Sequence, residues 1–166
     1  MQPGVIDSLE FARSYQQLRG RVAVAELSRL ADSLFETLGE LDYTLAGGHD
    51  SRQRPQLELK VKGTLALVCQ RCLGRLDFTL DVTSTLRVLA APSGNDSVSD
   101  EGADVDELDG VPADPVTSVC SLVEDEVLLA LPFAPKHAEG ECGLAVDAQP
   151  ESGKAPFAAL GALKRR

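Results

Sequence analysis

The chain has 166 residues, a formal net charge of −10 and four cysteines. A single domain of this length buries roughly 70% of its unfolded surface, so neither disulfides nor a metal are needed merely to supply a core. The N-terminus has no basic segment followed by an apolar leader, and no apolar run approaches about 18 residues. We therefore expect a soluble, cytoplasmic protein with reduced thiols.

The negative charge is concentrated in one part of the chain. Between Val88 and Pro135 there is no Lys or Arg, whereas 11 acidic residues lie there. Removing their charge from −10 leaves +1 for the rest of the chain. The overall charge alone would argue against nucleic acid as a partner, because phosphates are neutralised by Lys and Arg. The uneven distribution leaves that partner open.

The first third of the chain mixes helical and extended patterns. Apolar spacing within residues 5–34 predicts a helix, a short strand at residues 21–24 and a second helix up to Leu34. Residues 41–46 are again extended. The cluster Gly47-Gly48-His49-Asp50 predicts a turn directly after them.

The clearest regular structure is a predicted hairpin. Apolar residues alternate with polar ones over residues 57–68 and again over 76–88, which is typical of two long antiparallel strands joined at residues 69–74. A hairpin needs further strands or a helix over its apolar face. The predicted fold class is therefore α+β, with a mostly antiparallel sheet covered by N-terminal helices and a helix in the C-terminal half.

The second half begins with an acid-rich segment. Residues 91–113 carry few large apolar groups, which predicts a mobile acidic loop. Asp114 and Pro115 then predict the start of a helix over residues 116–131. On that helix the consecutive acids Glu124, Asp125 and Glu126 would fan over about 200°, so we expect a solvated face.

The predicted domain organisation is one α+β domain over residues 1–147, followed by a linker and a basic amphipathic tail over residues 148–166.

Two cysteines at the hairpin bend, Cys69 and Cys72, have the spacing of half a metal site, of a redox pair, or of two structural thiols. Thioredoxin-type chemistry favours a cysteine at a helix N-terminus, but here a strand follows; Arg71 could still lower a thiolate pKa. His137 and Cys142 could complete a tetrahedral site for a structural Zn²⁺ with no open position. All three interpretations stay open.

The fourth thiol, Cys120, falls on the apolar face of the predicted helix, where we expect it to pack as a small hydrophobe. No glycine-rich phosphate loop, nucleophile elbow or His-Glu-x-x-His motif is present, so an enzyme has little support.

Basic residues lie on the predicted strands and at the C-terminus, where they are either phosphate contacts or ordinary solubilising charges: Lys60, Lys62, Arg71, Arg75, Arg87, Lys154, Lys164, Arg165 and Arg166. The chain has 5 Phe, 2 Tyr and no Trp, too few for a base-stacking platform. RNA binding would then be led by shape or carried by partner proteins.

Three blocks together resemble the YceD family, the large ribosomal RNA subunit accumulation proteins. They are Val68-Cys69-Gln70-Arg71-Cys72-Leu73, the segment from Val123 through Glu-Asp-Glu to Leu131-Pro132, and Pro156-Phe157 through Leu163-Lys164-Arg165-Arg166. The resemblance implies a bacterial cytoplasmic factor for accumulation of large-subunit (23S) ribosomal RNA, acting in its synthesis, processing or stability, without established catalysis. It also implies an acidic variable loop. Some branches of the family carry more cysteines after the Leu-Pro motif, where this chain has only His137 and Cys142.

The expected partners are the large-subunit RNA precursor or ribosomal and assembly proteins, with no membrane and no small-molecule substrate. The candidate contact residues are Arg71, Arg75, Phe157, Leu160, Lys164, Arg165 and Arg166, because a basic tail with apolar residues could dock in a protein groove or against RNA. The acidic loop could mimic RNA charge toward basic proteins. The alternatives are a thiol oxidoreductase using Cys69 and Cys72, and a protein adaptor that does not contact RNA.

Overall fold

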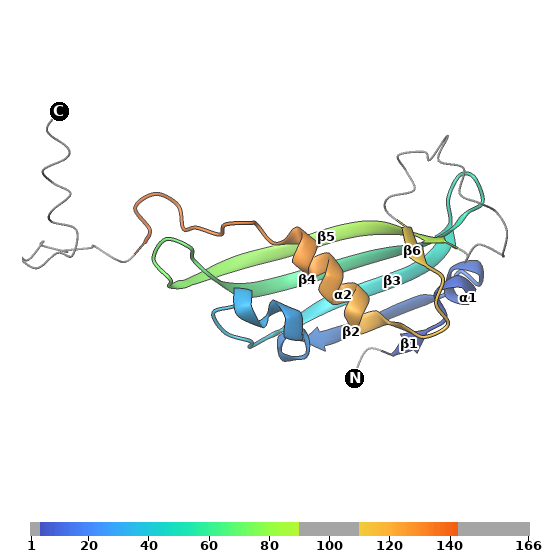
Figure 1. Cartoon of the computed structure of the whole chain (residues 1–166), viewed down its shortest axis with the longest axis horizontal. Coiled ribbons are helices and arrows are strands. Elements are labelled where there is room, and N and C mark those ends of the chain that lie inside the picture. The colour runs from blue at the N-terminus through green and yellow to red at the C-terminus, as the bar shows by residue number, and fades with distance from the viewer. Residues whose placement is uncertain (1–3, 90–109, 143–166) are drawn as a thin grey trace, which may run out of the picture.

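The computed structural model describes residues 4–89 and 110–142. A five-stranded sheet has the order β2-β3-β4-β5-β6, antiparallel except where β5 and β6 pair in parallel (Figure 1). Its strands are β2 (Gln17–Ala23), β3 (Glu40–His49), β4 (Pro55–Val68), β5 (Arg75–Leu89) and β6 (Gly110–Pro112). A small second sheet pairs β1 (Val5–Ile6) with β7 (Thr117–Ser118). The predicted α+β class is confirmed.

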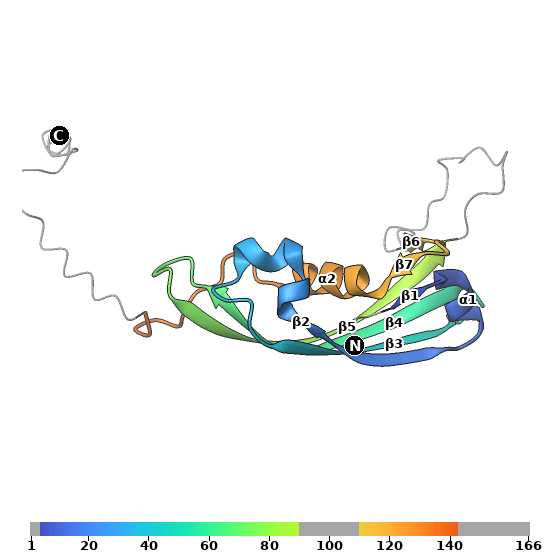
Figure 2. The same cartoon turned by 90° about the horizontal axis from the view of Figure 1, so that it is seen from below.

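The described helical segments lie on one face of the large sheet, as Figure 2 shows. They are α1 (Ser8–Arg13), the 3₁₀ turns η1 (Val24–Glu26) and η2 (Ser28–Ser33), and α2 (Val119–Ala130). The core forms between these helices and the inner sheet face, where leucines of β3 and β4 such as Leu45, Leu57 and Leu59 are fully buried. The longest described helix has 12 residues, and none could span a bilayer.

The predicted hairpin is confirmed. β4 and β5 pair without interruption from Gln56↔Arg87 to Val68↔Arg75. The alternation explains its two faces, because Leu59 and Val61 are fully buried whereas Lys60 between them is exposed. The sheet therefore buries one face and exposes the other.

The N-terminal prediction is only partly correct. Helix α1 ends at Arg13, and the residues after it form β2, which is longer than the predicted strand at residues 21–24. In β2, Arg19 and Arg21 are exposed whereas Val22 is buried, so the side chains alternate with a period of two. The helix predicted at Leu18 does not follow this period. The predicted second helix is present only as the two 3₁₀ turns.

The predicted turn at Gly47-Gly48-His49-Asp50 is wrong at its first residues, because β3 continues to His49. The glycine at position 47 serves packing: a Cβ there would lie 2.2 Å from the Phe11 carbonyl oxygen of α1. The turn itself is organised by the Asp50 carboxylate, which accepts hydrogen bonds from the amides of Arg52 and Arg54. The Arg54 amide is the largest cause that lowers the pKa of Asp50.

Helix α2 begins later than predicted. Ser118 is its N-cap, accepting a hydrogen bond from the Ser121 amide, whereas Asp114 caps the preceding turn at the Val116 amide. Residues 117–118 are held in β7 by their pairing with β1, which displaces the helix start. The predicted acidic loop is also too long, because residues 110–112 form β6. Its residues 91–109 and the predicted domain boundary, linker and tail lie outside the described residues.

Candidate metal centre

The four predicted ligands meet beside the β4–β5 bend. The segment after α2 returns along β5 to this bend (Figure 1). It is fixed there by a hydrogen bond of 2.8 Å from the Gln70 amide to the Pro135 carbonyl oxygen. As a result His137 and Cys142 reach Cys69 and Cys72.

Three of the distances within the cluster are close to those of a tetrahedral zinc site. The Cys69 and Cys142 sulfurs are 3.8 Å apart, and His137 Nδ1 lies 3.4 Å from Cys72 Sγ and 3.6 Å from Cys142 Sγ. With Zn–S bonds of about 2.3 Å and a Zn–N bond of about 2.0 Å, tetrahedral angles require about 3.8 Å between sulfurs and about 3.5 Å between sulfur and nitrogen. All four donor atoms lie within 4.8 Å of one another.

The bend itself is rigidly hydrogen-bonded. The Cys69 amide donates to the Gly74 carbonyl oxygen at 2.9 Å, and the Leu73 amide donates to the Cys69 carbonyl oxygen at 2.8 Å. Leu73 has a positive φ of 58°, which turns the chain from β4 into β5. Cys69 is fully buried in this bend, and Cys72 is half-buried.

The imidazole of His137 is oriented for ligation. Its Nε2–H donates to the Arg75 carbonyl oxygen at 2.8 Å, so Nδ1 is the atom that faces the thiols. Metal-binding histidines typically have such a carbonyl partner on the second ring nitrogen. The Cys142 sulfur is the largest cause that raises the pKa of His137, followed by the Arg75 carbonyl.

A guanidinium group balances the charge of the sulfurs. Arg71 Nε donates to Cys142 Sγ at 3.0 Å, and its Nη2 donates to the carbonyl oxygens of His137 and Ala138. Three thiolates around a divalent ion carry one excess negative charge, which Arg71 can neutralise. This predicted RNA-contact residue is therefore engaged within the protein.

The thiols differ in acidity. Burial would raise the pKa of Cys69, but hydrogen bonds from the amides of Cys72, His137 and Arg71 outweigh it and lower that pKa to about 5. The Gly74 amide lowers the pKa of Cys72, yet burial and the neighbouring sulfurs together raise it. Cys69 is thus a ready thiolate at neutral pH, as a metal ligand must be.

The other predicted residues lie elsewhere. Arg75 forms ion pairs with Glu36 and Asp77 on the open sheet face. Cys120 is outside the cluster and packs against the core, as predicted, and burial is the main cause that raises its pKa. The contact residues predicted in the tail lie outside the described residues: Phe157, Leu160, Lys164, Arg165 and Arg166.

The burial of two carboxylates was not predicted from the sequence. Glu124 and Glu126 are each only 6% exposed, so the predicted solvated face is wrong for both and holds only for Asp125. Glu124 accepts hydrogen bonds from the Arg29 amide at 2.6 Å and from Arg29 Nε at 2.7 Å, and Glu126 accepts one from the Ser84 hydroxyl. These partners lie on distant segments, so no local pattern could reveal them.

We expect Glu124→Ala to lower the free energy of unfolding by about 1–3 kcal/mol, because it removes a buried carboxylate that accepts hydrogen bonds from both the amide and the Nε of Arg29. The matched control is Asp125→Asn, which changes an exposed ion pair to the same arginine and should cost less than about 1 kcal/mol. Urea unfolding of both variants measures the difference. Equal losses would show that Glu124 contributes only as a surface charge.

The open face of the sheet carries several ion pairs. Arg21 pairs with Glu40, and Lys62 pairs with Asp81. Lys60 likewise pairs with a neighbouring glutamate of β4. The described part of this face therefore presents mixed charge.

Comparison with known proteins matches residues 57–164 to the family described as "Large ribosomal RNA subunit accumulation protein YceD". The chain belongs to the YceD family. The match includes β4 from residue 57 onward, all of β5, all four residues of the sulfur cluster and helix α2. This confirms the resemblance inferred from the three sequence blocks.

One curated YceD relative is similar over its whole length. The Haemophilus influenzae protein named large ribosomal RNA subunit accumulation protein YceD is 28% identical over 174 aligned residues, covering 99% of this chain and 97% of that protein. No solved structure matches the chain significantly.

Proposed function

We propose that this protein is a cytoplasmic, non-catalytic factor in biogenesis of the large ribosomal subunit, supporting the synthesis, processing or stability of its RNA. The observation that carries the proposal is the full-length similarity to a YceD protein named for accumulation of that RNA. The family match over residues 57–164 supports it. The partners would be the RNA precursor, ribosomal proteins or assembly proteins.

We further propose that Cys69, Cys72, His137 and Cys142 hold a structural Zn²⁺. The support is the donor set of three sulfurs and one imidazole nitrogen, which lie within 4.8 Å of one another, with Arg71 and the Arg75 carbonyl as outer partners. Such an ion would supply a charge-neutralising cross-link between the hairpin bend and the segment after α2. Four protein ligands fill a tetrahedral shell, which favours a structural role over catalysis.

A CxxC thiol oxidoreductase is the alternative favoured by one observation, the pKa of about 5 at Cys69. The burial of Cys69 weighs against it, because a reactive cysteine needs access to its disulfide partner. The hydrogen bonds that lower this pKa are equally suited to a metal-bound thiolate.

Direct RNA contact is a separate part of the proposal. Arg75, half-exposed beside the bend, and the basic tail that ends in Arg165 and Arg166 are the residues we assign to it. An adaptor that acts only through proteins would crosslink to ribosomal proteins and yield no RNA adducts in cells. Crosslinking at Arg75 or in the tail would instead place RNA next to this protein.

Removal of the gene should lower large-subunit ribosomal RNA relative to small-subunit ribosomal RNA, because the proposed factor supports only the former. The measurement is the ratio of the two RNAs together with sedimentation of ribosomal particles from cell lysates. Re-expression of the wild-type chain should restore the ratio. An unchanged ratio and normal levels of mature large subunits would contradict the proposed function.

A further inference from the structure

Among residues 4–89 and 110–142, the outer edge of β5 has no partner over most of its length. At one end β6 pairs with residues 87–89, and at the other end the His137 imidazole donates a hydrogen bond to the Arg75 carbonyl oxygen. Between them, within the described part of the chain, no strand or side chain binds the backbone of residues 77–85 on the side away from β4. An open strand edge of this length is a template for pairing with another chain.

The direction of the free backbone groups follows from the neighbouring contacts. The carbonyl oxygens of Arg75 and Leu89, both odd-numbered, accept hydrogen bonds on the side away from β4. Because β5 pairs with β4 without a bulge, alternate residues point the same way. Asp77, Thr79, Asp81, Thr83 and Thr85 therefore present N–H and C=O groups to the open edge.

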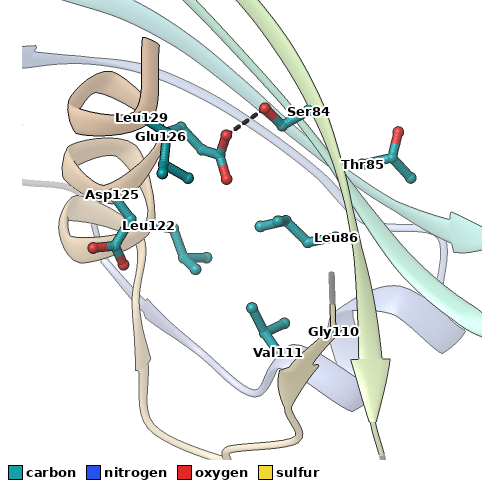
Figure 3. A pocket seen from close by; sticks show the side chains of 9 residues that line it. All are labelled: Ser84, Thr85, Leu86, Gly110, Val111, Leu122, Asp125, Glu126 and Leu129. Atoms are coloured by element: carbon teal, nitrogen blue, oxygen red, sulfur yellow. Dashed lines mark hydrogen bonds between the residues drawn. The ribbon is translucent and has the colours of Figure 1, made fainter. Parts of the chain in front are cut away.

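A groove of about 450 Å³ lies beside this edge, between β5, β6 and α2. Figure 3 shows Leu86, Val111 and Leu122 pointing into it, with Leu129 at its rim. Leu129 is 81% exposed, an unusual position for a leucine on a helix that otherwise packs on the core. The groove thus combines free backbone groups with an apolar floor.

The charge around the groove indicates which kind of segment could bind there. Asp125 and Glu126 line it, and none of its lining residues is basic. The sequence from Leu89 through Pro135 contains no Lys or Arg. An acidic segment would be repelled here, whereas lysines or arginines would be attracted to the rim.

We propose that this groove binds an extended, basic segment of a partner protein by strand addition. The segment lies along the β5 edge at residues 77–85, and its inward-facing side chains alternate into the space between Leu86, Leu122 and Leu129. About eight residues cover the free edge, at about 3.3 Å per residue. This surface goes beyond the proposed function and is argued from geometry, so its failure would leave the role in RNA accumulation untouched.

The test uses the full chain and a fluorescent octapeptide that alternates lysine and valine. Thr83→Pro removes one edge donor without touching the β4–β5 ladder, because the Thr83 amide points to the open side. We expect this variant to bind the peptide at least tenfold more weakly than the wild-type chain in fluorescence anisotropy. The matched control is Thr83→Ala, which keeps the amide and should bind like wild type. Leu129→Ser should weaken binding through the apolar side of the groove.

A second measurement does not depend on the stability of the proline variant. Amide hydrogen exchange of the wild-type chain should show that the peptide protects the odd-numbered residues of 77–85. An octapeptide alternating glutamate and valine should not bind. The proposal is overturned if the basic peptide fails to bind the wild-type chain, or if proline and alanine variants bind it equally. It is likewise overturned if sedimentation shows a dimer that Thr83→Pro abolishes, because a second copy of the chain would then bind this edge.

Discussion

Reduced full-length protein should bind one Zn²⁺ per chain, and replacing Cys72 or Cys142 with serine should weaken that binding by at least about 100-fold. Loss of an outer partner of a zinc site alone typically costs 10–100-fold, so loss of a direct ligand should cost more. The physical reason is the closed donor set, in which every ligand completes one tetrahedron. Metal analysis and competition with a chromogenic chelator measure content and affinity.

The matched control for the zinc prediction is Cys120→Ser. This thiol packs against the core and lies outside the cluster, so its replacement should leave zinc content unchanged. Less than roughly 0.2 equivalents of zinc in reductively purified protein would contradict the metal site. If the purified protein holds no metal and its Cys69–Cys72 pair reacts rapidly with an aromatic disulfide reagent, the oxidoreductase alternative would be favoured.

The second large effect is expected at Gly47. In Gly47→Ala the new methyl group would lie 2.2 Å from the Phe11 carbonyl oxygen and 2.8 Å from the Ala12 Cα, both backbone atoms of α1. Because neither atom can move without shifting the helix, we expect a loss of about 3 kcal/mol in the free energy of unfolding. Urea denaturation measures the loss.

The neighbouring glycine provides the control. No atom lies within 4 Å of a Cβ built on Gly48, which faces the open side of the sheet. Gly48→Ala should therefore leave stability unchanged or raise it by up to about 1 kcal/mol, through the reduced entropy of the unfolded chain. Similar losses in the two variants would show that α1 does not pack closely on β3.

The pattern of neighbouring residues was sufficient to predict the hairpin. The alternation in β4 and β5 is a property of consecutive residues, and both strands lie where the sequence predicts them. It failed in the N-terminal part, where Leu18 fits either a helix or a strand. Pairing of β2 with β3 along seven residue pairs decides between the two.

The sulfur cluster could be predicted only in part from the sequence. Spacing alone identifies Cys69 and Cys72 as two donors, and it suggests His137 and Cys142 as two more. Their convergence depends on the segment after α2 returning to the hairpin bend, a contact over more than 60 residues. The sequence also placed Arg71 beside the thiols, but its hydrogen bond to Cys142 and that of His137 to the Arg75 carbonyl oxygen are seen only in the tertiary structure.

By itself the sequence determined the family, the long hairpin and the identity of the candidate ligands, because these depend on neighbouring residues. Only the tertiary structure decided that Glu124 and Glu126 are buried, that Gly47 contacts α1, and that one edge of β5 has no partner among the described residues. Burial and pairing are set by whichever distant segment packs against a residue, and a one-dimensional pattern carries no record of that partner.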